Sequence, residues 1–150
     1  MVKPAVLLDS GPLGLLCHSR RSAVTTACEQ WLASLLSAGR RIIVPEITDY
    51  ELRRELLRIG RRAAIRRLDA LAQATEYLPL TTAAMRRAAE LWAQARQQGR
   101  PTAADNTIDA DMILAAQALT LNAPAAVIAT TNVGHLAHFV AAELWRNITP

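Results

Sequence analysis

Four carboxylates of this chain stand at the ends of hydrophobic segments. Asp9 directly follows an apolar tetrapeptide, and Glu51 lies one turn into a helix-like segment that follows a second apolar run. Asp109 and Asp111 directly precede a third. In α/β folds the ends of such elements form active sites, and carboxylates gathered at one place repel each other unless a cation lies between them. We therefore expect these acids to bind a hard divalent metal ion.

Asp9 and Glu51 each have a simpler structural interpretation. Asp9 opens the sequence Asp-Ser-Gly, a good turn in which the side chain bonds to nearby backbone. Glu51 lies three residues before Arg54 on the same predicted helix, so a surface ion pair would account for it. A buried strand before Asp9 favours a functional role, because the ends of parallel strands face the crevice above the sheet.

Asp109 and Asp111 are predicted to open a helix, after an irregular polar segment at residues 100–107. Acids are favoured at helix starts by capping and by the helix dipole, which accounts for one of them. Together with Asp105, the segment carries more negative charge than capping requires. A bound cation would relieve the repulsion.

Other catalytic chemistries are poorly supported by the spacing. Phosphatases with an aspartyl nucleophile need a second Asp two positions after the first, where this chain has Gly11. Neither a Gly-Lys-Ser/Thr phosphate loop nor a GxGxxG turn is present. Ser10 has no base partner in the pattern, and the histidines do not form an HExxH pair. Hydride transfer, P-loop hydrolysis and triad hydrolysis are therefore disfavoured.

Basic charge is concentrated in residues 53–67, here called the basic stretch. The whole chain carries +4, but the basic stretch has seven arginines and one acid and carries +6, which leaves −2 elsewhere. Arginine binds phosphate or carboxylate through its planar fork, so this stretch is expected to meet one of them. The alternative is a solvated helix face. The candidate contact residues are the first five arginines, Arg53, Arg54, Arg58, Arg61 and Arg62.

Strand-like and helix-like segments alternate along the chain. Apolar runs predict buried strands at residues 5–9, 41–44 and 125–130, and an edge strand at 77–80. Helices are expected at the intervening positions: a short one ending near residue 17, one capped by Ser22 or Thr25 that stops at Gly39, helices at 45–60 and 63–74, one from Thr81 or Thr82 to about 99, and one through 113–119. The tail after residue 138 is expected to pack back on the body. This order predicts one α/β domain over residues 1–150, a three-layer α/β/α sandwich with a mainly parallel central sheet.

The bulk properties favour a cytoplasmic protein without a membrane segment. The chain has 150 residues, of which 51% are hydrophobic. No apolar run approaches the roughly 20 residues of a membrane span, and the N-terminal run is too short for a signal peptide. The two cysteines, Cys17 and Cys28, have neither CxxC spacing nor a histidine pattern, so a disulfide or zinc site is not expected.

Four segments together resemble the successive motifs of the PIN-domain family. They are residues 6–13 (VLLDSGPL), 48–54 (TDYELRR), 109–116 (DADMILAA) and 129–136 (ATTNVGHL). In order and spacing they are similar to the VapC-type ribonuclease toxins of toxin–antitoxin pairs and to their stand-alone relatives. The resemblance covers nearly the whole chain.

The resemblance implies a PIN-like fold and an endoribonuclease, a hydrolase that depends on Mg²⁺ or Mn²⁺. Asp9, Glu51 and Asp111 match the acids of the family motifs, as catalytic residues and metal ligands. Asn132 stands where many members carry a fourth acid, and an amide is a neutral ligand that cannot act as a base. Asp109 is then the candidate for the missing negative charge at the metal.

The resemblance also implies partners. These are an RNA substrate held by the basic stretch, an antitoxin protein whose acidic tail would bind the same arginines, and a second copy of the chain in a homodimer. Two alternatives stay open: a PIN-like module that binds RNA or protein with weak or no catalysis, and a structural or oligomerisation domain whose acids only cap helices.

Overall fold

A parallel sheet forms the centre of the molecule. The computed structural model describes residues 2–99 and 105–150. In these residues five strands form one sheet in the order β3-β2-β1-β4-β5, and all paired neighbours are parallel. The strands are β1 (Ala5–Leu8), β2 (Ile42–Pro45), β3 (Glu76–Leu78), β4 (Ala126–Thr130) and β5 (Ala142–Leu144). The predicted α/β class is confirmed.

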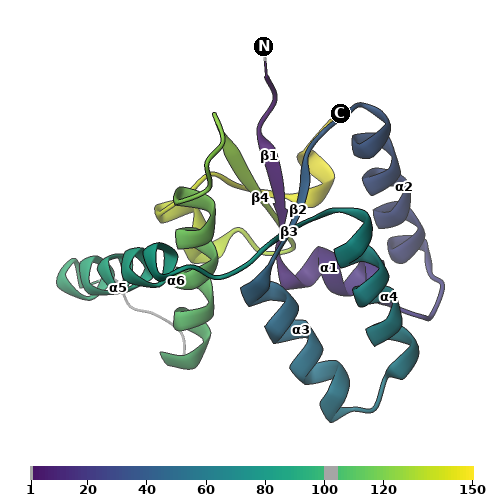
Figure 1. Ribbon diagram of the computed structural model, residues 1–150, viewed down its shortest axis with the longest axis horizontal. Coiled ribbons are helices and arrows are strands. Elements are labelled where there is room, and N and C mark those ends of the chain that lie inside the picture. Colours follow the sequence, from purple (N-terminus) through teal and green to yellow (C-terminus); the bar gives the residue numbers. More distant parts are fainter. Residues whose placement is uncertain (1, 100–104) are drawn as a thin grey trace.

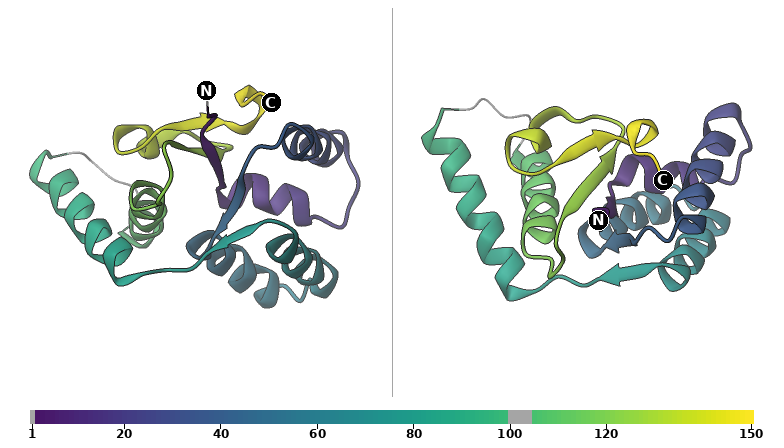
Figure 2. Two further views of the ribbon diagram at one scale, coloured as in Figure 1. Left: turned by 45° about the horizontal axis from the view of Figure 1, so that its top comes forward. Right: turned by 90° about the horizontal axis from the view of Figure 1, so that it is seen from above.

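Helices cover both faces of this sheet. They are α1 (Ser10–Cys17), α2 (Ala23–Ser37), α3 (Glu46–Arg58), α4 (Arg62–Ala74), α5 (Thr82–Gln97) and α6 (Asp105–Leu119), with short 3-10 helices η1 (Gly134–His138) and η2 (Trp145–Asn147). Figure 1 shows α5 and α6 on one side of the sheet and α1, α2 and α4 on the other, and the turned views of Figure 2 agree. Helix α3 contributes Leu56 to the core on one face and Ile47 to the core on the other. The result is the predicted three-layer sandwich.

The central strand β1 is buried on both faces. Successive side chains of a strand point to opposite faces, and Val6 and Leu8 enter one hydrophobic cluster while Ala5 and Leu7 enter the other. A strand between two helical layers needs apolar residues at every position. This requirement explains the uninterrupted apolar run before Asp9.

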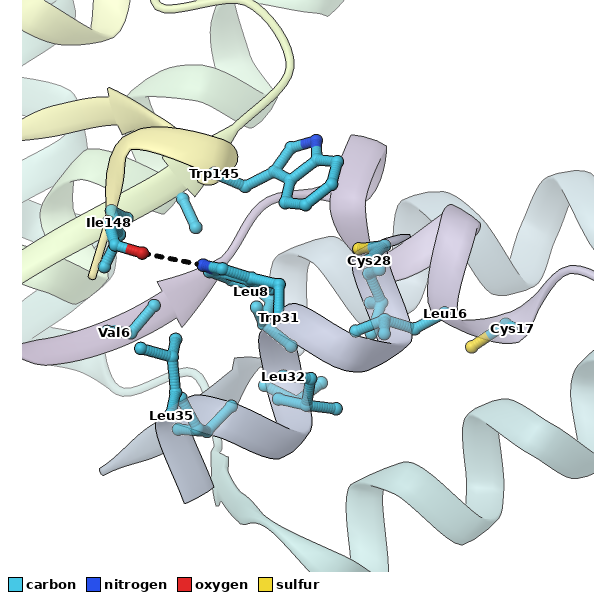
Figure 3. Packing of buried hydrophobic residues seen from close by; sticks show 14 of the residues in the cluster. Val6, Leu8, Leu16, Cys17, Cys28, Trp31, Leu32, Leu35, Trp145 and Ile148 are labelled. Carbon is cyan, nitrogen blue, oxygen red and sulfur yellow. Dashed lines mark hydrogen bonds between the residues drawn. The ribbon is translucent and has the colours of Figure 1, made fainter. Parts of the chain in front are cut away.

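The C-terminal tail closes the core on the α2 face (Figure 3). The indole Nε1 of Trp31 donates a hydrogen bond to the carbonyl of Ile148 at 2.9 Å, and its ring lies edge-on to Trp145 with centroids 5.5 Å apart. An edge-to-face aromatic pair adds about 0.5–1.5 kcal/mol beyond the burial of its area. The tail therefore packs back on the body, as predicted.

Two helix starts follow the predicted capping signals, and a third, for which none was predicted, has no side-chain cap. Ser22 and Thr25 form a reciprocal capping box at the start of α2, and the Thr81 hydroxyl accepts from the backbone N–H of Ala84 at the start of α5. These bonds satisfy N–H groups that a helix leaves unpaired. Helix α3 starts after Pro45 with no side-chain cap of its own.

One prediction about the second half of the chain is wrong, and one strand there was not predicted. Helix α6 begins at Asp105, whereas the sequence predicts irregular structure up to residue 107 and a helix start at Asp109. Polar residues such as Asp, Asn and Thr are favoured at helix starts as well as in loops, so composition alone misplaces the boundary. The tail also contains β5, whose three residues are too few to show a strand period. Residues 100–104 lie outside the described part of the chain.

No helix within the described residues is long and apolar enough to cross a membrane.

Candidate metal centre

Asp9 lies where β1 ends, at the edge of the sheet formed by the C-terminal ends of the strands, here called the carboxyl edge. Its two carboxylate oxygens have different donors. The backbone N–H of Ser10 donates to Oδ1 at 2.7 Å, and the hydroxyl of Thr130, at the end of the neighbouring β4, donates to Oδ2 at 2.7 Å. The first bond is the N-cap of α1, as the turn interpretation requires. The second comes from 121 residues further along the chain and fixes the carboxylate against β4.

The first turn of α1 packs tightly on the residue that follows β4. A Cβ added at Gly11 would lie 2.4 Å from the Oγ1 of Thr131, closer than real Cβ contacts come. Only glycine fits here unless the Thr131 side chain moves. The close approach keeps Asp9 beside the end of β4.

Glu51 reaches the same region from α3 and is half-buried. Burial, followed by the negative charges of Asp9 and Asp111, raises the pKa of Glu51 from 4.5 to about 7, while Arg54 has a smaller opposing effect. The proposed surface ion pair with Arg54 is wrong: no ion pair of Glu51 occurs within the described residues, and the Arg54 guanidinium lies over the ring of Tyr50 at 5.1 Å.

Asp111 joins this group from α6. It is half-buried, and burial together with the charge of Asp9 raises the pKa of Asp111 from 3.8 to about 6. Because α6 begins six residues earlier, Asp111 lies in its second turn and is not a cap. Asp9, Glu51 and Asp111 therefore come together from three separate elements, and we call them the acid cluster.

Asp109 is exposed, two residues before Asp111. Residues at this spacing in an α-helix are rotated by about 200°. Asp109 is not among the charges that raise the pKa of Glu51 or Asp111. Its role as a fourth carboxylate stays a prediction. The side chain of Asp105 lies outside the described residues.

Asn132 lies in the loop after β4 with its side chain exposed. Its backbone N–H donates to the hydroxyl oxygen of Thr130 at 3.1 Å. The same hydroxyl donates to Asp9, so Thr130 connects this loop to the acid cluster. The sequence pattern did not indicate this contact between Thr130 and Asp9.

His135 is a second residue of the site that the sequence pattern missed. It lies half-buried in η1, and its charge acts on Asp111 by lowering that carboxyl's pKa, against the larger effects of burial and Asp9. Its position in the sequence could have indicated this role, because loops that follow the carboxyl ends of strands form the sites of α/β folds.

The donor chemistry of the acid cluster fits a hard divalent cation. Within the described residues, no three side chains of His, Cys, Asp or Glu stand close enough to form a complete metal site on their own. Burial, followed by the negative charge of neighbouring carboxylates, nevertheless raises the pKa of both Glu51 and Asp111. Magnesium keeps several waters and binds proteins through only one or two carboxylates, so a converged protein cage is not required. A cation here would offset the mutual repulsion.

The basic stretch is only partly available to a ligand. Arg53 contacts Asp49 at 3.0 Å and Asp69 at 2.7 Å, and Arg58 pairs with Glu55. The Arg67 guanidinium donates to the carbonyl of His18. In the described part of the chain, the exposed arginines of this stretch that have no ion pair are Arg54, Arg61, Arg62 and Arg66.

A cavity of about 570 Å³ lies between α1, α3 and α4. Gly11 and Gly14 line it near the acid cluster, and Leu52 and Leu56 give it an apolar side. Arg61 lines it from the start of α4, so part of the basic stretch borders this cavity.

The chain belongs to the PIN-domain family: the family's sequence model matches residues 7–148. This match spans all three residues of the acid cluster and confirms the resemblance drawn from the four motifs. No curated protein matches the sequence.

Solved structures share the fold. FitAcB from Neisseria gonorrhoeae has a TM-score of 0.71 at 21% identity, covering 95% of this chain and 99% of that one. VapBC2 from Rickettsia felis, bound to a DNA fragment from its promoter, has a TM-score of 0.70 at 16% identity and covers 93% and 97%. VapBC-1 from nontypeable Haemophilus influenzae has a TM-score of 0.67 at 21% identity and covers 95% and 99%. At these identities the likeness concerns the fold.

Proposed function

We propose that this protein is a metal-dependent endoribonuclease that hydrolyses RNA phosphodiester bonds at the acid cluster. The observation that carries the proposal is the meeting of Asp9, Glu51 and Asp111 at the carboxyl edge of a PIN-domain sheet, without an arginine to pair with them in the described residues. Acids left unpaired in a partly buried site are a mark of function rather than of stability.

Asp9 and Asp111 would hold Mg²⁺ or Mn²⁺, and Glu51 would bind the ion directly or through water. When bound, such an ion supplies a water of lowered pKa and positive charge that offsets charge on the phosphoryl oxygens. Thr130 keeps Asp9 oriented through its 2.7 Å hydrogen bond. Asp109 and Asn132 would act as additional, outer ligands of the metal ion or of the RNA phosphate.

Glu51 is suited to accept or donate a proton at this site. Its pKa of about 7 places its carboxylate near half-ionised at neutral pH, which is the condition for a general base or acid. A cation beside it would shift the balance toward the carboxylate form.

The RNA backbone would follow the exposed arginines of the basic stretch. Arg54, Arg61 and Arg62 are exposed, Arg61 lines the cavity beside α1 and α3, and guanidinium forks bind phosphate bidentately. Arg53 and Arg58 would contribute less, because their guanidinium groups already contact acids.

We further propose that the protein is the toxin of a toxin–antitoxin pair in the cytoplasm and forms a homodimer. The solved structures of similar fold include VapBC proteins, and the four sequence motifs resemble VapC-type toxins. An antitoxin with an acidic tail would complement the arginines and the neighbouring cavity. Size-exclusion chromatography with light scattering tests the dimer.

The second candidate is a PIN-like module that binds RNA or protein with little catalysis. Asn132 favours it, because an amide stands where many family members have a fourth acid. Metal-independent binding of RNA, without cleavage, would support this candidate.

Cleavage of a labelled RNA in the presence of Mg²⁺, Mn²⁺ or a chelator tests the proposed function. The parent protein is expected to cleave only with metal, and Asp9→Asn to lose at least about a hundredfold in rate. Glu90→Gln is the matched control, since Glu90 is an exposed acid of α5 that pairs with Arg87. Equal cleavage by Asp9→Asn and the parent would refute the proposal.

A further inference from the structure

Gln117 is a polar side chain held in the core between three elements. It lies on α6 and is only 1% exposed. Its Oε1 accepts from the backbone N–H of Ile47 at 3.3 Å, and its Nε2 donates to the carbonyl of Leu78 at 2.9 Å. A buried amide of this kind is stable only when its hydrogen bonds are made.

The bond to Ile47 serves as the missing cap of α3. The first N–H groups of a helix have no partner inside it, and Pro45 supplies no side-chain cap. Gln117 provides an acceptor from another helix. In the same turn, the Glu46 carboxylate accepts from the backbone N–H of Leu80 at 2.6 Å. The first turn of α3 is therefore held by α6 on one side and by the segment after β3 on another.

The same contact lies one helical step from the acid cluster on α3 and two steps from it on α6. Ile47 and Glu51 are four residues apart on α3 and share a face. On α6, Asp111 and Gln117 are each three residues from the buried Leu114. The two helices pack against each other, so the Gln117 contact sets where α3 begins relative to α6.

We propose that Gln117 is a positioning residue that sets the separation of the Glu51 and Asp111 carboxylates by capping α3 from α6. The inference rests on the proposed metal-binding role of these acids. Asp9 does not depend on this contact, because the backbone of Ser10 and the hydroxyl of Thr130 fix it independently. Glu51 and Asp111 lack such bonds within the described residues and rely on the placement of their helices.

An apolar side chain at this position would fill similar space but leave two groups unpaired. The N–H of Ile47 and the carbonyl of Leu78 would then need new partners, which favours a shift of the first turn of α3. Glu51 moves with that turn. Outer partners of metal sites typically contribute about tenfold or more to affinity through such placement.

The test is calorimetric titration of MnCl₂ into the full chain carrying Gln117→Met, at a temperature well below unfolding. Gln117→Met keeps the length of the side chain and removes both hydrogen bonds, and Gln117→Leu carries the same expectation if the first variant does not fold. The matched control is Trp31→Phe, which removes a buried side-chain to backbone bond on the opposite face of the sheet. Thermal unfolding of each variant measures the stability lost.

We expect Mn²⁺ affinity to fall about tenfold in Gln117→Met and to stay at the parent value in Trp31→Phe. The metal concentration for half-maximal RNA cleavage should rise in parallel, with the rate at saturating metal largely kept. Parent-like Mn²⁺ affinity in Gln117→Met, with stability reduced as in Trp31→Phe, would show a purely structural role and overturn the inference alone. A parent protein that binds no Mn²⁺ would overturn the proposed function, and this inference with it.

Discussion

Helix α3 carries two acids in opposite surroundings. Asp49 accepts hydrogen bonds from the Arg53 guanidinium at 3.1 Å and from the Tyr77 hydroxyl at 2.7 Å. Glu51 lies two residues later, on another side of the helix. Its burial and the negative charges of Asp9 and Asp111 raise its pKa to about 7. Several arginines are close by in the sequence. Arg53 contacts Asp49, whereas no arginine forms an ion pair with Glu51 within the described residues. The paired acid holds α3 in place, and we propose that the unpaired one meets a cation.

The largest effect is expected for loss of an unpaired acid. Asp111→Asn removes one charge of the acid cluster while keeping the shape of the side chain, and RNA cleavage should fall by at least about a hundredfold. The fold should remain, because relief of repulsion offsets any lost contact. Single-turnover cleavage and circular dichroism measure the two effects. A rate equal to that of the parent would place the reaction elsewhere.

The paired acid should give the reverse pattern. Asp49→Ala leaves Tyr77 and Arg53 without their buried partner, and we expect unfolding free energy to fall by about 2–4 kcal/mol, as urea denaturation would measure. Mn²⁺ affinity should stay close to the parent value. Asp69→Ala is the control, because Asp69 contacts the same Arg53 at an exposed position and should cost less than about 1 kcal/mol. Loss of metal binding in Asp49→Ala would contradict the proposed difference, in which Glu51 binds the metal and Asp49 stabilises the fold.

The pH dependence of the protein's stability is a further test of the environment of Glu51. Since the pKa of Glu51 is raised from 4.5 to about 7, the folded chain keeps a proton that the unfolded chain has lost across this range. Stability without metal therefore falls as the pH rises through it. Mg²⁺ should raise the melting temperature near pH 8 and much less near pH 5, where protons replace the cation. Thermal unfolding with EDTA or MgCl₂ checks this, and an unchanged melting temperature across the range in EDTA would contradict it.

The smallest effect is expected for Glu51→Gln without metal. Removing a charge held in an unfavourable place should raise the melting temperature near pH 8 by a few degrees, about 1 kcal/mol or less. The same substitution should reduce the shift produced by Mg²⁺. A lower melting temperature in EDTA would mean that the Glu51 carboxylate makes a stabilising contact.

Local pattern was enough to predict much of the fold. The apolar run before Asp9 predicts a doubly buried strand because both faces of the central strand meet helices. Ser22 and Thr81 mark helix starts through bonds to residues only three positions away. The start of α6 was misplaced at Asp109, because polar residues suit both a loop and the first turn of a helix.

The site depends on contacts that a single sequence does not contain. The Thr130 hydroxyl reaches Asp9 only because β1 and β4 are neighbours in the sheet. In the same way, Arg54 stands at helical spacing from Glu51 but lies over Tyr50. Spacing therefore identified Asp9, Glu51 and Asp111 as candidates, whereas the partners of each acid follow from strand order and helix packing.

The most direct measurement is a crystal structure of the full chain soaked in MnCl₂, with data collected at a wavelength where manganese scatters anomalously. We predict an anomalous peak at the carboxyl edge of the sheet, within coordination reach of the carboxylates of Asp9 and Asp111 and joined to Glu51 directly or through water. A structure with manganese bound only elsewhere, or with none bound at these acids, would contradict the proposed metal centre.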